Sequence, residues 1–160
     1  MLEIRQINEQ DYQLIVKWNE GKDKDYLNQW AGSKIYQYPI TIDQIKEHDK
    51  DKASQIYIIF FESNPIGSVE LDRINIENSS ANACRFIISD NNLNKGYGTL
   101  ALKQLVKIAF TEMGLNRLTL SVFCYNIGAL RCYEKVGFFV KEYNKREDPN
   151  WNSYVMEIKN

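Results

Sequence analysis

The chain has 160 residues, of which 44% are hydrophobic and 26% are charged. This length and balance are typical of a single globular domain, here residues 1–160, with enough apolar side chains for a substantial core. Lys and Arg total 20 against 21 Asp and Glu. Because this balance provides no basic field, we expect no nucleic-acid partner.

The apolar segments and the thiols exclude several further classes. Residues 1–5 show no basic segment followed by an apolar run, and no later stretch approaches the ~20 apolar residues of a membrane-spanning helix. Cys84, Cys124 and Cys132 are odd in number and lack CxxC spacing, which indicates reduced thiols. A single histidine, His48, makes neither a zinc centre nor a histidine triad. We expect a cytoplasmic protein with no membrane association and no metal.

The first part of the chain is predicted to form one strand and three helices. Apolar and polar residues alternate over residues 2–7, as in a half-buried strand, and Asn8 then caps a helical pattern. Two further helical patterns cover residues 23–30 and 41–48.

Three strands follow in the middle of the chain. The almost continuous apolar run at residues 55–61 predicts an interior strand, and a turn joins it to an antiparallel partner at residues 66–71. A third strand is predicted at residues 83–89. Simple alternation along it puts Cys84, Phe86 and Ile88 on one face, with Arg85 and Ile87 on the other.

The last part of the chain alternates helices and strands. Two glycines open a helix, which leads to a strand at residues 118–124. Because a helix connects this strand to the preceding one, we expect the two strands to pair in parallel. Asn126 caps another helix that ends at Gly137, and closing strands follow at residues 138–143 and 154–158. The predicted class is therefore α/β (α+β): a mixed, mostly antiparallel sheet of about seven strands with helices on both faces.

The loop Lys95-Gly96-Tyr97-Gly98-Thr99 is the strongest candidate binding element. It delivers the chain into a helix, where unpaired N–H groups and the helix dipole attract phosphate. The glycines allow close approach of the backbone, and the lysine adds a cation. The alternative is that the glycines only permit a tight turn.

Two other nucleotide motifs fit this loop badly. Gly96, Gly98 and Ala101 satisfy GxGxxA, but a long polar loop separates them from the preceding strand, and residues 118–124 contain no carboxylate for a ribose. A nicotinamide enzyme is therefore disfavoured. No Gly-Lys-Ser/Thr of a Walker loop occurs.

A second motif lies further along the chain, with the residues Asn126, Ala129, Leu130, Tyr133, Glu134, Lys135, Val136, Gly137 and Phe138. Together the two segments resemble those of GNAT acetyltransferases, in which a Q/R-x-x-G-x-G/A segment binds the pyrophosphate of coenzyme A. The resemblance is strongest from about Ala83 to Phe138. One departure is that the leading Gln or Arg falls on Leu93, so Lys95 and the backbone must supply more of the anion binding.

The resemblance implies acetyl-CoA as co-substrate, with its pantetheine arm along the main chain that ends the third strand. The cofactor-binding residues that it implies are Ile87, Ile88, Ser89, Asn94, Lys95, Gly96, Tyr97, Gly98, Thr99, Asn126, Ala129 and Tyr133. Asn126 has the simpler role of a helix cap as an alternative.

The resemblance also implies catalytic roles. Tyr133 falls at the family's usual general-acid position, where it would protonate the departing thiolate; its alternative is a core tyrosine. Glu70, on the polar face of its strand, is the candidate general base, and a solvated carboxylate is the alternative. Cys124 and Cys132 have no histidine nearby to activate them, so packing explains them better than nucleophilic catalysis.

The predicted function is an acetyl-CoA-dependent N-acetyltransferase that acts directly on an amine of a small molecule, a peptide or a protein N-terminus. A catalytically silent acyl-CoA-binding module is the alternative. The acceptor pocket is expected from residues 23–38 and 144–151, and a homodimer is the default oligomer.

Overall fold

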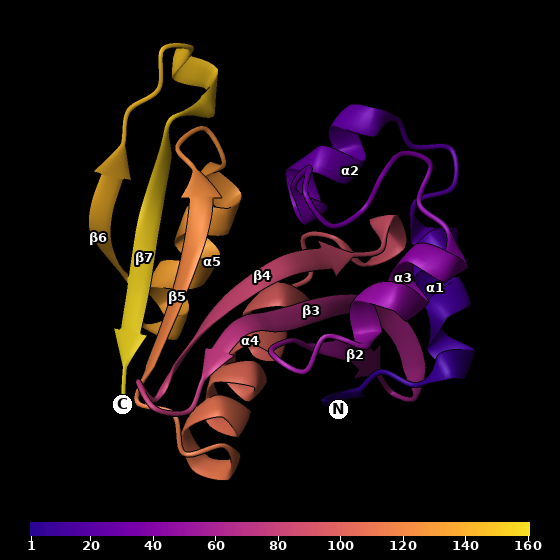
Figure 1. Ribbon diagram of the computed structural model, residues 1–160, viewed down its shortest axis with the longest axis horizontal. Helices are drawn as coiled ribbons and strands as arrows, with labels where there is room; N and C mark the ends of the chain where they lie inside the picture. The colour runs from indigo at the N-terminus through magenta and orange to yellow at the C-terminus, as the bar shows by residue number, and fades with distance from the viewer.

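The computed structural model describes residues 1–160, and all its strands belong to one sheet (Figure 1). The strands are β1 (Leu2–Gln6), β2 (Gln55–Phe61), β3 (Asn64–Asn75), β4 (Ser80–Ile88), β5 (Arg117–Phe123), β6 (Phe139–Asn144) and β7 (Ser153–Lys159). Their order across the sheet is β1-β2-β3-β4-β5-β7-β6. Only β4 and β5 pair in parallel, so the predicted mixed, mostly antiparallel sheet of seven strands is confirmed.

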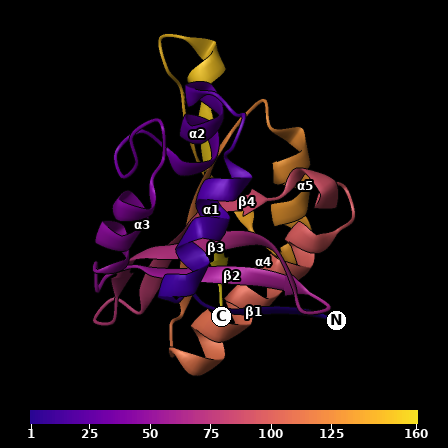
Figure 2. The ribbon, with the colours of Figure 1, turned by 90° about the vertical axis from the view of Figure 1, so that its right-hand side faces the viewer.

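Five helices cover the two faces of the sheet (Figure 2). They are α1 (Tyr12–Trp18), α2 (Lys24–Ala31), α3 (Ile42–Asp49), α4 (Tyr97–Lys107) and α5 (Ile127–Val136). A π-helical turn, Ile108–Glu112, extends α4. Helices α1, α2 and α3 pack on one face, and α4 and α5 pack on the other. None of the helices combines the length and apolarity needed to cross a bilayer.

Side-chain caps fix the starts of three helices where the sequence predicts them. Asp23, Thr41 and Asn126 each accept a hydrogen bond from a backbone N–H in the first turn of α2, α3 and α5. Asn8 instead caps a short 3₁₀ turn, Glu9–Asp11, that leads into α1. These caps satisfy N–H groups that the helix itself leaves unpaired.

Strand β2 shows how one strand serves two cores. Ile56 and Ile58 pack beneath α1 to α3, whereas Tyr57 and Ile59 pack beneath α4. Successive side chains of a strand point to opposite faces, so a strand covered on both sides is apolar throughout. The predicted interior strand is confirmed.

The parallel pair separates shortly after it begins. Strands β4 and β5 are paired only where Ser80–Asn82 face Arg117–Thr119. Beyond these residues β4 turns toward α2, while β5 continues beside β7 (Figure 1). The second half of β4 is therefore unpaired on its β5 side.

A bulge in β4 accompanies this separation. Glu70 pairs with Cys84 and Ser68 pairs with Ile87, so β4 contains one residue more than β3 over the same length. Arg85 takes the left-handed backbone conformation, with φ 47°. This two-against-one pairing bends the strand and increases its twist.

The bulge overturns the predicted alternation of side chains along β4. Cys84 and Arg85 lie on the same side, where the guanidinium Nη1 is 3.0 Å from the thiol sulfur. Ala83, Phe86 and Ile88 all pack with the opposite core, beneath α4 and α5. The prediction that Cys84, Phe86 and Ile88 share a face is wrong, because the extra residue reverses the alternation at Arg85.

Gly67 on β3 allows this close packing of β4. A Cβ at this position would collide with the main-chain oxygen of Ile87, so Gly67→Ala requires β4 to move. We expect a loss of about 2–3 kcal/mol in the free energy of unfolding, measured by denaturant unfolding. The matched control is Gly128→Ala in α5, where a Cβ meets no atom within 4 Å and stability should be unchanged or slightly raised. Equal midpoints for the two variants would contradict this packing argument.

Candidate active site

The separated end of β4, the loop before α4 and the facing side of α5 enclose a cleft, which we call the α4–α5 cleft. Its lining residues are Phe86, Ile88, Asn92, Leu93, Asn94, Gly96, Tyr97, Gly98, Ala129, Cys132 and Tyr133. The fold therefore brings together the two sequence motifs, which are about 30 residues apart in the chain.

The N-terminus of α4 presents free main-chain donors to this cleft. The first helical hydrogen bond runs from Leu100 N–H to the carbonyl of Gly96. None of the N–H groups from Asn94 to Thr99 donates to an acceptor within the protein, and no side chain caps the helix. Free main-chain donors at a helix N-terminus are suited to bind an anion such as a phosphate.

Gly96 and Gly98 are each required for a different structural reason. Gly96 has φ 81°, a left-handed conformation in which a side chain is strained, and open space surrounds its Cα. Gly98 lies against the ring of Phe86, which a Cβ would approach to 3.2 Å. Lys95 is exposed beside them and does not line the cleft. Leu93, which stands where the GNAT pattern has Gln or Arg, is 48% exposed and lines the cleft with an apolar side chain.

Only one of the three predicted residues at the end of β4 has its main chain open to the gap. The N–H of Ser89 donates to the carbonyl of Ile66 on β3 at 2.8 Å, and its hydroxyl accepts from Asn92. Main-chain groups alternate in direction along an antiparallel strand, so the N–H and C=O of Ile88 face away from β3. Ile87 pairs with β3, and its side chain is buried. Ile88 is therefore the residue positioned to bond a ligand in the gap.

Helix α5 forms the opposite wall of the cleft. Asn126 accepts a hydrogen bond from Ala129 N–H at 3.2 Å, which is its predicted capping role. Ala129 lines the cleft, whereas Asn126 and Thr99 do not. The hydroxyl of Thr99 lies 3.4 Å from the sulfur of Cys132 and links α4 to α5. Burial raises the pKa of the Cys132 thiol, which disfavours a reactive thiolate.

Tyr133 lines the cleft with its phenol side chain. Its ring packs on Phe138, with 6.3 Å between the ring centroids, and its hydroxyl has no hydrogen-bond partner in the protein. Burial, with a smaller contribution from Cys132, raises the pKa of Tyr133 to about 12. The phenol is thus protonated at neutral pH and available as a proton donor.

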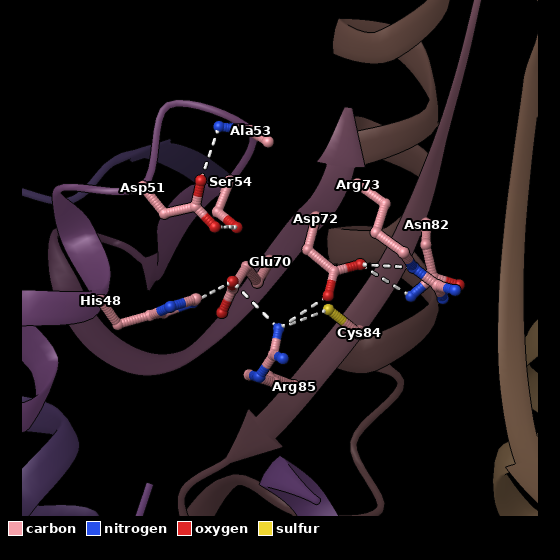
Figure 3. Close-up of polar contacts among 10 residues, drawn as sticks. All are labelled: His48, Asp51, Ala53, Ser54, Glu70, Asp72, Arg73, Asn82, Cys84 and Arg85. Carbon is pink, nitrogen blue, oxygen red and sulfur yellow. Dashed lines mark hydrogen bonds and ion pairs between the residues drawn. The ribbon is translucent and has the colours of Figure 1, made fainter. Parts of the chain in front are cut away.

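Glu70 lies on the other side of the sheet, in a cluster of polar side chains that we call the Glu70 cluster (Figure 3). Its Oε1 accepts from Arg85 Nη1 at 3.0 Å and is in contact with His48 Nε2. The same guanidinium nitrogen bonds Asp72 at 3.1 Å, and Asn82 donates to the other oxygen of Asp72. Although burial alone would raise it, hydrogen bonds from Asn82 and Arg85 lower the pKa of Asp72. Glu70 is only 2% exposed, so it is not a solvated strand carboxylate.

The contact between His48 and Glu70 was not predicted from the sequence, where His48 stands in a run of charged residues. A weak signal was available: His48 follows Ile45 by three residues, and both are buried on the same side of α3. Spacing of three places two residues on one helical face. Which strand residue this face meets depends on the packing of α3 on β3 and β4.

These features define a class of fold: a mixed sheet with a split parallel pair, beside which lie a helix N-terminus with free main-chain donors and a protonated phenol. A family model described as an acetyltransferase (GNAT) domain matches residues 1–139. The chain therefore belongs to the GNAT family and is an N-acetyltransferase, as the sequence motifs predict.

Individual relatives agree with this assignment. Acetyltransferase PseH of Campylobacter jejuni is 26% identical over 140 residues, which cover 88% of this chain and 84% of PseH. Spermidine N(1)-acetyltransferase of Vibrio cholerae is 25% identical over 142 residues, 88% of this chain and 81% of that protein. The crystal structure of Vibrio cholerae spermidine N-acetyltransferase with CoA and spermine has the same fold, with a TM-score of 0.81 and 23% identity over 99% of this chain and 95% of that one.

The raised pKa of Tyr133 can be tested by titration. A phenol with a pKa of about 12 stays mostly protonated at about pH 11, where an ordinary tyrosine, with a pKa near 10, is about 90% ionised. Tyr133→Phe should therefore leave the phenolate absorbance that develops up to about pH 11 unchanged, and the difference from wild type should appear only above it. Loss of one phenolate equivalent below that pH would show that Tyr133 titrates as an exposed residue.

Proposed function

We propose that the chain transfers the acetyl group of acetyl-CoA directly to an amine of a small molecule, and that residues 1–160 form a single catalytic domain. The observation that carries this proposal is the row of free N–H groups from Asn94 to Thr99 beside the phenol of Tyr133. Acetyl-CoA supplies an activated thioester, and its pyrophosphate matches these donors in charge and hydrogen-bonding capacity. Lys95 adds a cation at the rim of the site.

The main chain of β4 serves the acyl end of the cofactor. The open N–H of Ile88 is a donor for the thioester carbonyl, whose oxygen gains negative charge during acyl transfer. Such preorganised donors stabilise the transition state more than the ground state. The glycine loop and Ile88 thus bind opposite ends of the same co-substrate.

Two side chains move the protons. Tyr133, kept protonated by its raised pKa, donates to the departing thiolate. Glu70 accepts the proton that the ammonium form of the acceptor must lose before it attacks. Both polar contacts of Glu70 fall on Oε1. Oε2 makes no hydrogen bond, and it is not among the fully buried polar atoms that lack one, so it is open to a ligand. An open oxygen is what a base requires.

The acceptor reaches the gap from the α1–α3 side of the sheet. Glu70 lies on that side and Tyr133 on the α5 side, so acceptor and cofactor would meet between β4 and β5. Glu70 and Asp72 place two carboxylates near one guanidinium, which favours a cationic amine. Spermidine, the substrate named for the Vibrio cholerae relative, belongs to that class.

The three unpaired cysteines favour a cytosolic location.

The cofactor site is tested by a substitution that fills part of the cleft with a larger side chain. Gly98→Val adds an isopropyl group that meets the ring of Phe86 and the sulfur of Cys132, both of which line the cleft, so coenzyme A should bind at least about tenfold more weakly in calorimetry. Gly128→Ala, where the added Cβ meets no neighbour, is the control and should bind as wild type does. Unchanged affinity in a folded Gly98→Val protein would mean that coenzyme A binds elsewhere.

The acid role of Tyr133 is tested by turnover. Amines, polyamines, aminoglycosides and N-terminal peptides are screened for release of coenzyme A thiol, and the best acceptor is kept. Tyr133→Phe should lower kcat about 100-fold or more and leave the KM for acetyl-CoA nearly unchanged, because only proton donation is lost.

Direct transfer is tested by the kinetic mechanism: initial rates with acetyl-CoA and the acceptor varied together should show a ternary complex. Ping-pong kinetics with an acetylated cysteine would refute direct transfer, and absence of turnover with every amine would favour the silent binding module.

A further inference from the structure

His48 is the least explained member of the Glu70 cluster. It lies in the last turn of α3, is 9% exposed, and its Nε2 contacts Oε1 of Glu70 (Figure 3). The chain contains no other histidine. A buried imidazole whose single polar contact is the proposed base requires a reason.

The hydrogen bonds around Oε1 of Glu70 define what each group does. Arg85 Nη1 can only donate, and it donates to this oxygen at 3.0 Å. Oε1 is therefore an acceptor. Because Glu70 must be ionised to act as a base, Oε1 carries no proton, and we assign Nε2 of His48 as the second donor in their contact. The carboxylate is held by one oxygen from two directions, from α3 and from β4, and Oε2 is left without a partner.

Arg85 alone would not maintain this geometry. A guanidinium and a carboxylate prefer to pair through two parallel hydrogen bonds. Arg85 has the donors for such a pair, because its buried Nε has no hydrogen-bond partner. Without a second donor on Oε1, the carboxylate of Glu70 would turn both of its oxygens onto Arg85. No oxygen would then remain for the substrate.

Packing fixes the imidazole itself. The ring of Tyr36, 3% exposed, meets the imidazole edge to face, with 5.6 Å between centroids and 86° between planes. Ile45, fully buried one turn earlier, anchors the same face of α3. Because a buried side chain in close packing has little freedom to rotate, the burial of the imidazole against Tyr36 helps to keep Nε2 directed at Glu70.

We propose that His48 is a positioning residue for acetyl transfer: it holds Glu70 by Oε1 so that Oε2 stays turned to the acceptor. The proposal rests on the proposed role of Glu70 as the base. His48 touches neither acceptor nor cofactor, so its loss affects the chemical step and not the binding of acetyl-CoA. Gln is the conservative replacement, because its side-chain amide can supply the same N–H donor.

The test compares four variants by kcat and by the KM for acetyl-CoA, with the best acceptor from the amine screen. His48→Leu removes the donor and should lower kcat about 10-fold to 100-fold, with the KM for acetyl-CoA within about twofold of wild type. His48→Gln should recover kcat to within about threefold. In a Glu70→Gln background, adding His48→Leu should cause no further loss, because both changes remove the same function.

The outcomes separate the two proposals. Wild-type kcat in Glu70→Gln overturns the base role of Glu70. If the Glu70→Gln variant is slow but the His48→Leu variant has the wild-type kcat, only the positioning role of His48 is overturned. That role is also overturned if the His48→Gln variant folds but has a kcat as low as that of His48→Leu. Thermal unfolding checks each variant, and His48→Met, which fills the same space without an N–H donor, replaces His48→Leu if that protein does not fold.

Discussion

The early end of the pairing between β4 and β5 is the constraint on which the rest of the site depends. A parallel pair that continued would bond every main-chain group of both strands, and the sheet would be closed at this point. Here the pairing stops after three residue pairs, and the bulge at Arg85 bends β4 away. Main-chain N–H and C=O groups require partners, so the edge near Ile88, which has no partner strand on the β5 side, leaves main-chain groups available to a ligand.

The two faces of the sheet beside this separation carry different kinds of side chains. On the α4–α5 side, the cleft contains glycines, apolar side chains and the phenol of Tyr133. On the α1–α3 side, buried carboxylates, a guanidinium and an imidazole form a hydrogen-bonded cluster. Buried charges persist only when they are paired. Leaving one oxygen of Glu70 unpaired is therefore a local cost, offset by the donors that hold the other oxygen.

The elements with local signals were predicted well from the sequence. The helix start at residue 41, the cap Asn126, the apolar run of β2 and the parallel pair joined by α4 all appear as expected. So does the helix N-terminus at Gly96, whose left-handed conformation needs glycine. These features depend on a few neighbouring residues and on elementary rules of capping and alternation.

The face assignment of β4 could not be predicted in the same way. One extra residue reverses every later side chain, and nothing in the local sequence marks Arg85 as the residue that adopts φ 47°. The pairing of β3 with β4 determines the register. The cofactor motifs could be predicted without this register, because those residues lie after the bulge, on a loop and two helices that begin at their own local signals.

The sequence by itself determined the fold class, the family and the uncapped glycine start of α4, because each depends on residue types at fixed spacings within short segments. Tertiary structure alone decided that His48 meets Glu70, that Arg85 shares the same oxygen and that Ile88 keeps its main chain free. These contacts join residues 15 to 22 positions apart or depend on strand register. They arise only when α3, β3 and β4 pack together, because hydrogen bonds between side chains depend on position in space and not on distance along the chain.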